Sequence, residues 1–240
     1  MSRLPDGTLR MVLPNCLFMP PLKCLKIGKT DLPRSKNSEG KGNNQHQLNQ
    51  KDMANYCDST YRISGEASEM DALYNLMLKL EAEKENGNWV GHIVEALNGG
   101  KIPSHLYTRG WWDDLEREED SIRFHLESAW EPLYEAFDFI CSKYKTLTAY
   151  FIGEEPGCEV YLKRDNDLYG WFPDNFYLDA KPPKGDYVQE YFIDIQTAFR
   201  YIEKLDDVNI ITADDIEALN LVWQEEDPDA YIYLHEFKEV

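Results

Sequence analysis

Residues 121–130 read SIRFHLESAW, and apolar and polar side chains alternate through them. A repeat of two residues is typical of a β-strand, in which successive side chains point to opposite faces. The apolar face holds Ile122, Phe124, Leu126 and Ser128, and the other face holds Arg123, His125 and Glu127. We therefore predict a strand with one buried face, as in an antiparallel sheet that carries its core on one side.

The residues before this strand predict a second strand and a helix. Residues 59–64 alternate in the same way, and Gly65 ends the strand. Ser68, followed three residues later by an acid, is typical of a helix start. Apolar side chains recur at helical spacing from there to Asn86-Gly87, which is a stop signal.

The residues after the strand predict a second helix and two more strands. Pro132 is placed where it can open a helix. Residues 147–152, LTAYFI, form an apolar run that predicts a central strand, which Gly153 is expected to end. Residues 159–163 predict another strand. This order is close to the βαββαβ order of a ferredoxin-like fold, an α+β fold with an antiparallel sheet and its helices on one face.

Residues 88–120 fit neither repeat, and we interpret them as an insertion packed against the sheet. A short helix is expected over residues 89–97, followed by Trp111-Trp112 and by the acidic run 113–120. We expect the two tryptophans to pack against the fold. The alternative is a patch that binds a ligand or a protein.

The last part of the chain predicts a further α/β unit. It would contain strands at 187–195 and 231–237 and helices at 196–205 and 212–223. The sequence therefore divides into a leader at 1–52, a ferredoxin-like α+β domain at 53–185 and a C-terminal α/β extension at 186–240.

Charge separates the leader from the rest of the chain. Residues 1–52 contain nine basic and four acidic side chains, whereas residues 53–240 contain 16 basic and 40 acidic ones, a formal charge of −24. We expect the basic leader to be poorly ordered, because residues 29–52 are almost free of large apolar groups. Two explanations stay open: a flexible tail, or an upstream extension of a chain that naturally starts at Met53.

Several classes of function are disfavoured by composition. An acidic body repels phosphate backbones, so we expect no nucleic-acid binding. No run of 18 apolar residues occurs, so we expect no membrane span. The five cysteines lack C-x-x-C spacing and suit reduced thiols in a cytoplasmic protein. No phosphate-loop, dinucleotide or H-E-x-x-H motif is present, so we expect no cofactor and no metal.

Glu154 and Glu155 are the candidates for acid–base chemistry. With His125 they could serve a hydrolase. However, neighbours in a strand point to opposite faces, so the two carboxylates would not converge on one atom. Pro156-Gly157 directly after them is a turn signal.

Three stretches together resemble a known family. They are MANYCDSTYRISG at 53–65, FHLESAWEPLYEAFDFICSKY at 124–144 and TAYFIGEEPGCEVY at 148–161. They are similar to the YubB-type ferredoxin-like proteins of phages, plasmids and other mobile elements, whose members open with Met-[Ala/Pro]-Asn-[Trp/Tyr]-Cys. The matching motif residues are Asn55, Cys57, Trp130, Pro132, Glu154, Glu155 and Gly157.

The resemblance covers roughly residues 53–178 and implies a ferredoxin-like topology without an iron–sulfur cluster. It implies no catalytic residues. We therefore expect a non-enzymatic protein-binding module of a mobile element, in which Trp130 and the turn at 154–157 cluster at one end of the sheet and form a recognition surface. The alternatives are the hydrolase and an acidic mimic of DNA that blocks a nuclease.

Overall fold

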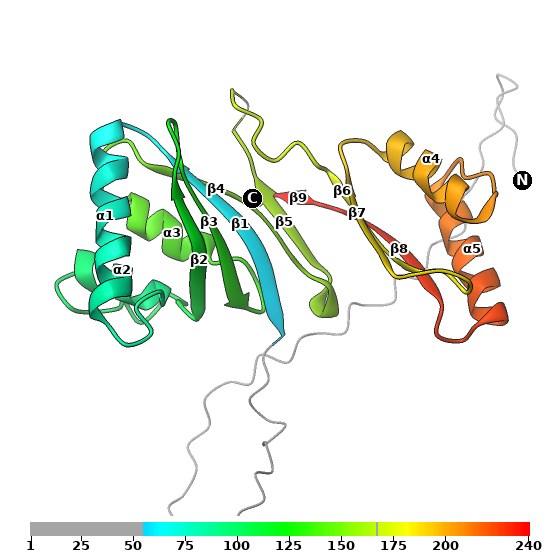
Figure 1. The fold of residues 1–240 in the computed structure, drawn as a ribbon, viewed down its shortest axis with the longest axis horizontal. Helices are drawn as coiled ribbons and strands as arrows, with labels where there is room; N and C mark the ends of the chain where they lie inside the picture. Colours follow the sequence, from blue (N-terminus) through cyan, green and yellow to red (C-terminus); the bar gives the residue numbers. More distant parts are fainter. Residues whose placement is uncertain (1–54, 167) are drawn as a thin grey trace, which may run out of the picture. The chain divides into compact units, whose positions relative to one another are not determined.

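A computed structural model describes residues 55–166 and 168–240, so the predicted leader lies outside the described residues. These ranges form a mixed α+β structure with five α-helices and two sheets (Figure 1). The helices are α1 (Ala67–Glu83), α2 (Val90–Leu97), α3 (Tyr134–Cys141), α4 (Ile195–Asp206) and α5 (Ala213–Glu226). The strands are β1 (Tyr56–Ser64), β2 (Gly110–Arg117), β3 (Ile122–Ala129), β4 (Thr148–Glu155), β5 (Val160–Arg164), β6 (Phe176–Lys181), β7 (Val188–Phe192), β8 (Tyr231–Glu236) and β9 (Lys238–Glu239).

The larger sheet has six strands in the order β2-β3-β1-β4-β5-β9. All its pairs are antiparallel except β5 with β9, which run parallel, so the sheet is mixed. Figure 1 shows α1, α2 and α3 together on one face of this sheet. The opposite face carries no helix of the described chain, and we call it the open face.

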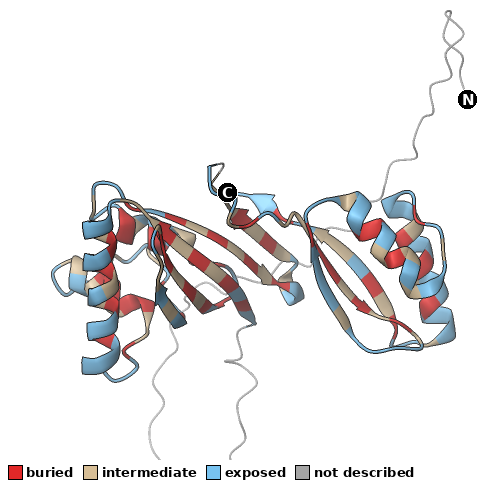
Figure 2. Ribbon diagram, turned by 45° about the horizontal axis from the view of Figure 1, so that its top comes forward, coloured by how far each residue is buried: buried red, intermediate tan, exposed pale blue. Residues whose placement is uncertain are grey.

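The core lies between this sheet and its three helices. Side chains alternate between buried and accessible along β1 and β3, as Figure 2 shows for both strands. Tyr61, Phe124 and Phe137 meet there, with ring centroids 4.6–5.4 Å apart. The strand predicted over 121–130 is confirmed, because Ile122, Phe124 and Leu126 are fully buried.

The region predicted as an insertion, residues 88–120, contains an element of the sheet itself. The short helix is confirmed as α2, but the two tryptophans begin β2, which pairs with β3. Trp112 is buried in the core, and Trp89 forms a bridge to Trp111. The strand was missed because its register shifts between Asp113 and Glu116, which breaks the alternation that identifies a strand.

Gly153 does not end the fourth strand, which was another error of the prediction. β4 lies between β1 and β5 as expected, but it continues to Glu155. A Cβ atom at residue 153 would lie 2.3 Å from Ser59 Oγ and 2.9 Å from Pro132 Cγ. Glycine is therefore required by the close approach of β1 and of the segment that leads into α3, and it does not mark a turn here.

The second sheet has three antiparallel strands in the order β7-β6-β8. One face packs on α4 and α5 through a core that includes Leu178, Ile202 and Trp223. Strand β6 was not predicted, and the expected boundary after residue 185 separates it from β7 and β8, with which it pairs. Helix α5 starts as expected, because Thr212 and Asp215 form a reciprocal capping box.

The two sheets are joined by the C-terminal strands and by a buried lysine. β8 belongs to the smaller sheet and β9 to the larger, with Phe237 between them in a cluster with Tyr161 and Tyr177. Lys163 is 5% exposed. Its Nζ lies 2.6 Å from Asn175 Oδ1 and 3.3 Å from a carboxylate oxygen of Glu239.

Replacement of Gly153 by alanine tests the close approach. We expect Gly153→Ala to lower the free energy of unfolding by about 1–3 kcal/mol, because the new methyl group overpacks the contact with Ser59 and Pro132. Urea unfolding followed by tryptophan fluorescence measures the change. Gly185→Ala is the matched control, since its Cβ would meet only Pro182 at 3.6 Å. Equal unfolding midpoints for both variants would contradict the packing argument.

Candidate functional site

The motif residues meet at one end of the larger sheet, where β1 starts and where β3 and β4 end. The Trp130 amide donates a hydrogen bond to the Asn55 carbonyl oxygen at 2.9 Å. The Asn55 side-chain amide lies 3.8 Å from Cys158 Sγ and beside Gly157. Glu155 Oε1 accepts a hydrogen bond from the Gly157 amide at 2.9 Å. The structure therefore brings Asn55, Trp130, Glu155 and Gly157 together at this end.

Trp130 is exposed and held in an unusual backbone conformation. Its φ is +76°, a region that bulky L-residues rarely adopt. The residue is 41% exposed, and neighbouring Tyr56 is 55% exposed. The pairing of Tyr56 with Ala129 and the hydrogen bond to Asn55 position the backbone on both sides of the turn. Strained conformations of this kind persist only where the surrounding structure imposes them.

The remaining motif residues have packing roles. Cys57 is fully buried, and burial raises the pKa of its thiol to about 12. Pro132 fills the space beside Gly153. Glu155 is buried, and its second carboxylate oxygen has no hydrogen-bond partner among the described residues. We therefore expect Cys57 and Pro132 to shape this end of the sheet from within rather than to contact a ligand.

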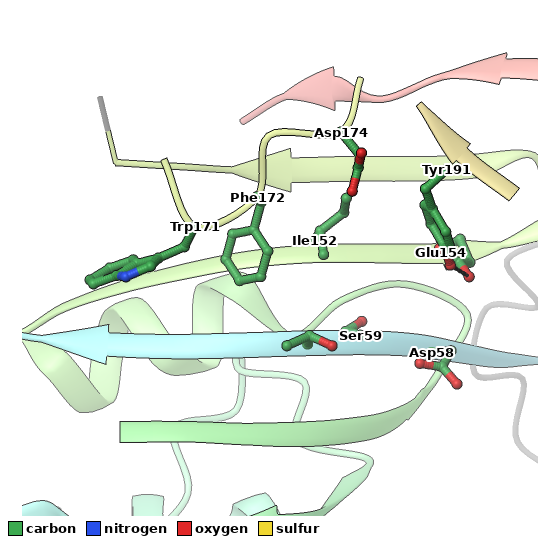
Figure 3. Close-up of a pocket in the computed structure, with 9 residues that line it drawn as sticks. Asp58, Ser59, Ile152, Glu154, Trp171, Phe172, Asp174 and Tyr191 are labelled. Carbon is green, nitrogen blue, oxygen red and sulfur yellow. Dashed lines mark hydrogen bonds between the residues drawn. The ribbon is translucent and has the colours of Figure 1, made fainter. Parts of the chain in front are cut away.

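A hollow of about 230 Å³ lies on the open face of the larger sheet (Figure 3). Glu154 and Asp58 line it from β4 and β1, where they are directly paired. Trp171 and Phe172 line it from the segment that follows β5. Asp165 holds that segment, because its carboxylate accepts hydrogen bonds from the amides of both aromatic residues at 3.0 Å.

Glu154 is a carboxyl group whose pKa is strongly raised by burial in this hollow. Burial raises the pKa of its carboxyl to about 7, and the negative charge of Asp58 adds to the increase. The Tyr191 hydroxyl donates a hydrogen bond to the carboxylate, which opposes the rise. Figure 3 shows these two side chains together at one end of the hollow. Because the hydroxyl comes from β7, the bond connects the two sheets.

His125 lies on the same face but is bound by two carboxylates. Its ring nitrogens are 2.7 Å from Asp113 Oδ1 and 2.7 Å from Asp58 Oδ1. Burial lowers the pKa of the imidazole, but these two carboxylates outweigh it and raise the pKa overall. A histidine that donates through both nitrogens has no lone pair for general-base catalysis. Glu155, on the opposite face, does not join this group, as the strand geometry predicted.

Sequence reasoning missed Asp58, Asp113 and Tyr191 as members of this site. Asp58 could have been found, because it continues the polar face of β1 at the period of two. Asp113 lies where the register of β2 shifts, and Tyr191 comes from the other sheet. No local sequence pattern identifies Asp113 or Tyr191 as a residue of this site.

Among residues 55–166 and 168–240, no three histidine, cysteine or acidic side chains are arranged as a metal site. No helix within the described part of the chain has both the length and the apolar character needed to cross a bilayer.

Comparison of the chain with protein-family models, with curated proteins and with solved structures finds no match. The resemblance to the YubB-type proteins therefore stays a prediction.

The raised pKa of Glu154 predicts a specific pH dependence of stability. Its carboxyl is protonated in the folded chain up to about pH 7 but ionises near pH 4.5 when unfolded. The stabilisation is therefore complete below pH 4.5 and is lost as the pH rises through 7, by up to about 3 kcal/mol. Glu154→Gln removes this dependence and keeps an acceptor for Tyr191.

The measurement is the free energy of unfolding in urea at several pH values between 4.5 and 7.5. We expect the variant to gain stability relative to the natural chain across this range, and the difference isolates Glu154 from His125. A constant difference at every pH would show that the folded carboxyl titrates normally.

Proposed function

We propose that this chain is a cytoplasmic, non-enzymatic protein-binding module of a mobile genetic element, and that Trp130 is the centre of its recognition surface. The observation that carries the proposal is the exposed indole on a backbone with φ of +76°. Exposure of a tryptophan and an unfavourable backbone conformation both cost stability and both suit a binding residue. Tyr56, which pairs with Ala129 beside this turn, is exposed as well.

The proposal includes a ferredoxin-like arrangement of the first four strands. Its support is the order β2-β3-β1-β4, in which every neighbouring pair is antiparallel. One helix pair, α1 and α2, connects β1 with β2, and α3 connects β3 with β4. This is the connectivity of a βαββαβ unit with its helices on one face. Fold alone does not assign the role, which rests on the surface described above.

The charge of the chain indicates the kind of partner. Residues 53–240 carry a formal charge of −24, so a basic protein surface would be attracted and an acidic one repelled. Nucleic acids are disfavoured for the same reason. The alternative of a DNA mimic also uses acidity and stays a prediction, which a nuclease-inhibition assay tests.

A hydrolase is the second candidate function, and one observation favours it. Glu154 has a pKa raised to about 7 and lies beside Asp58 in a hollow, and two carboxyls in unlike environments can act as acid and base. The participants differ from those predicted, because Glu155 is on the other face and His125 is bound by Asp58 and Asp113. Loss of a detected hydrolytic activity in Glu154→Gln would support this candidate.

Substitution of Trp130 tests the recognition surface. We expect Trp130→Ala to reduce capture of a bound protein from the native cell extract at least tenfold, since a central interface tryptophan contributes about 2 kcal/mol or more. Leu221→Ala is the control, because Leu221 is also a large apolar side chain and is 64% exposed, on α5. Quantitative mass spectrometry of the captured proteins provides the readout. Equal capture by both variants would refute the role of Trp130.

A second comparison at the same position separates strain from contact. Trp130→Gly and Trp130→Ala both remove the indole, but only glycine adopts a φ of +76° without steric cost. We expect the glycine variant to be about 1 kcal/mol more stable than the alanine variant in urea unfolding, with equally poor capture of the partner. An alanine variant as stable as the glycine variant would show that the backbone there is not strained.

A further inference from the structure

The smaller sheet turns a tyrosine-rich face away from its helices. Leu178, Ala180 and Ile232 point into the core with α4 and α5, so the alternate residues of the strands form the other face. In this face Tyr177 pairs with Tyr191 and His235, and Asp179 pairs with Gln189 and Tyr233. Tyrosine is enriched where proteins bind one another, because its ring offers a large rigid contact and its hydroxyl a hydrogen bond.

A second hollow, of about 460 Å³, lies at the β8 edge of this face. Aromatic rings form one part of its lining: His235 stacks on Tyr161 with centroids 4.1 Å apart, and Tyr233 follows at 6.1 Å from His235. Carboxylates form the other part, from Glu159, Asp179 and Asp229. No lysine or arginine is among the lining residues.

Two polar atoms of this lining are buried and have no hydrogen-bond partner among the described residues. They are the Tyr161 hydroxyl and Asp179 Oδ1. Buried groups of this kind are rare in folded proteins and call for an explanation, such as a ligand that supplies donors.

The chemistry of the lining selects a planar organic cation. Aromatic faces attract cations, and guanidinium stacks on such rings better than ammonium because it is planar and weakly hydrated. Its five N–H donors match carboxylate and hydroxyl acceptors. Burial lowers the pKa of His235, so its ring is neutral at pH 7 and does not repel the cation.

We propose that this hollow binds the guanidinium group of an arginine side chain presented by a basic peptide segment of the partner. Glu159 and Asp229 attract the group at the exposed rim, and the rings of Tyr233 and His235 stack on it, with Tyr161 supporting His235 from behind. The hollow adjoins the surface around Trp130, because Pro156 lines it and belongs to the turn that also holds Gly157 and Cys158. That the guanidinium belongs to a peptide of a protein partner rests on the proposed function, whereas the binding of a guanidinium group in this hollow does not.

Titration of the full chain with N-acetyl-arginine amide, followed by NMR, tests the site at physiological salt. We expect saturable shifts with the arginine compound and none with N-acetyl-citrulline amide, which has the same shape without the charge. The double variant Glu159→Gln with Asp229→Asn should weaken binding about fivefold. Its charge-matched control is Glu119→Gln with Glu135→Gln, two exposed acids in the β2–β3 turn and in α3, which should change binding less than twofold.

The ring contribution is tested at Tyr233, which is 46% exposed and therefore tolerates substitution. We expect Tyr233→Ala to weaken binding severalfold and Tyr233→Phe to retain it, because phenylalanine keeps the aromatic face. N-propylguanidine presents the same guanidinium with the same single charge but without a peptide backbone, and tighter binding of N-propylguanidine than of the arginine amide would overturn the peptide source.

Three outcomes would overturn the guanidinium site itself. They are an equal loss of arginine binding in the control Glu119→Gln with Glu135→Gln, no loss of binding in either double variant, and binding of the citrulline compound. Trp130→Ala should bind the arginine compound normally. A chain that fails to bind arginine but still loses its partner in Trp130→Ala would refute this inference and leave the proposed function intact.

Discussion

The arrangement of the open face depends on one buried charge, the Nζ of Lys163. It lies on β5 and reaches Asn175 Oδ1 at 2.6 Å, with the backbone oxygens of Asp174 and Phe172 at 3.3 and 3.4 Å. Glu239 on β9 provides the counter-charge at 3.3 Å. A buried ammonium is tolerated only when it is paired and its hydrogens are bonded, so this group constrains three segments at once.

Two surface features follow from that constraint. Residues 171–175 are held over the open face, so Trp171 and Phe172 cover part of it and form the wall of the hollow that contains Glu154. The parallel pairing of β9 with β5 also fixes where the chain leaves β8, which places Phe237 against Tyr161. The hollow that contains Glu154 and the second hollow, at the β8 edge, are therefore consequences of how the sheets are joined.

The sequence predicted the elements whose repeat is local and missed those that depend on distant partners. All five helices of the described chain and strands β1, β3, β4, β5, β7 and β8 could be recognised because each carries its own period, apolar run or cap. β2 was hidden by its register shift, and Gly153 was misread because its neighbours Ser59 and Pro132 come from other segments. For the site, Asn55, Trp130, Glu155 and Gly157 lie together as a pattern of neighbouring strand ends allows, but the bonds of Asp58 and Tyr191 join residues 37 or more positions apart.

Three unfavourable features occur next to the surfaces described above, and the Tyr61 hydroxyl of the main core and Glu155 Oε2 are further buried polar atoms without a hydrogen-bond partner among the described residues. Trp130 has a positive φ, Glu154 has a carboxyl whose charge is opposed by burial, and Asp179 has a buried oxygen without a partner. Each costs on the order of 1–3 kcal/mol, a large share of the 5–15 kcal/mol that stabilises a typical domain. The aromatic core around Tyr61 and the bonded Lys163 keep the fold stable enough to tolerate these costs. Because selection for stability alone disfavours such features, the position of Glu154 and Asp179 in the linings of two hollows and the exposure of Trp130 support the proposal that these surfaces bind a partner.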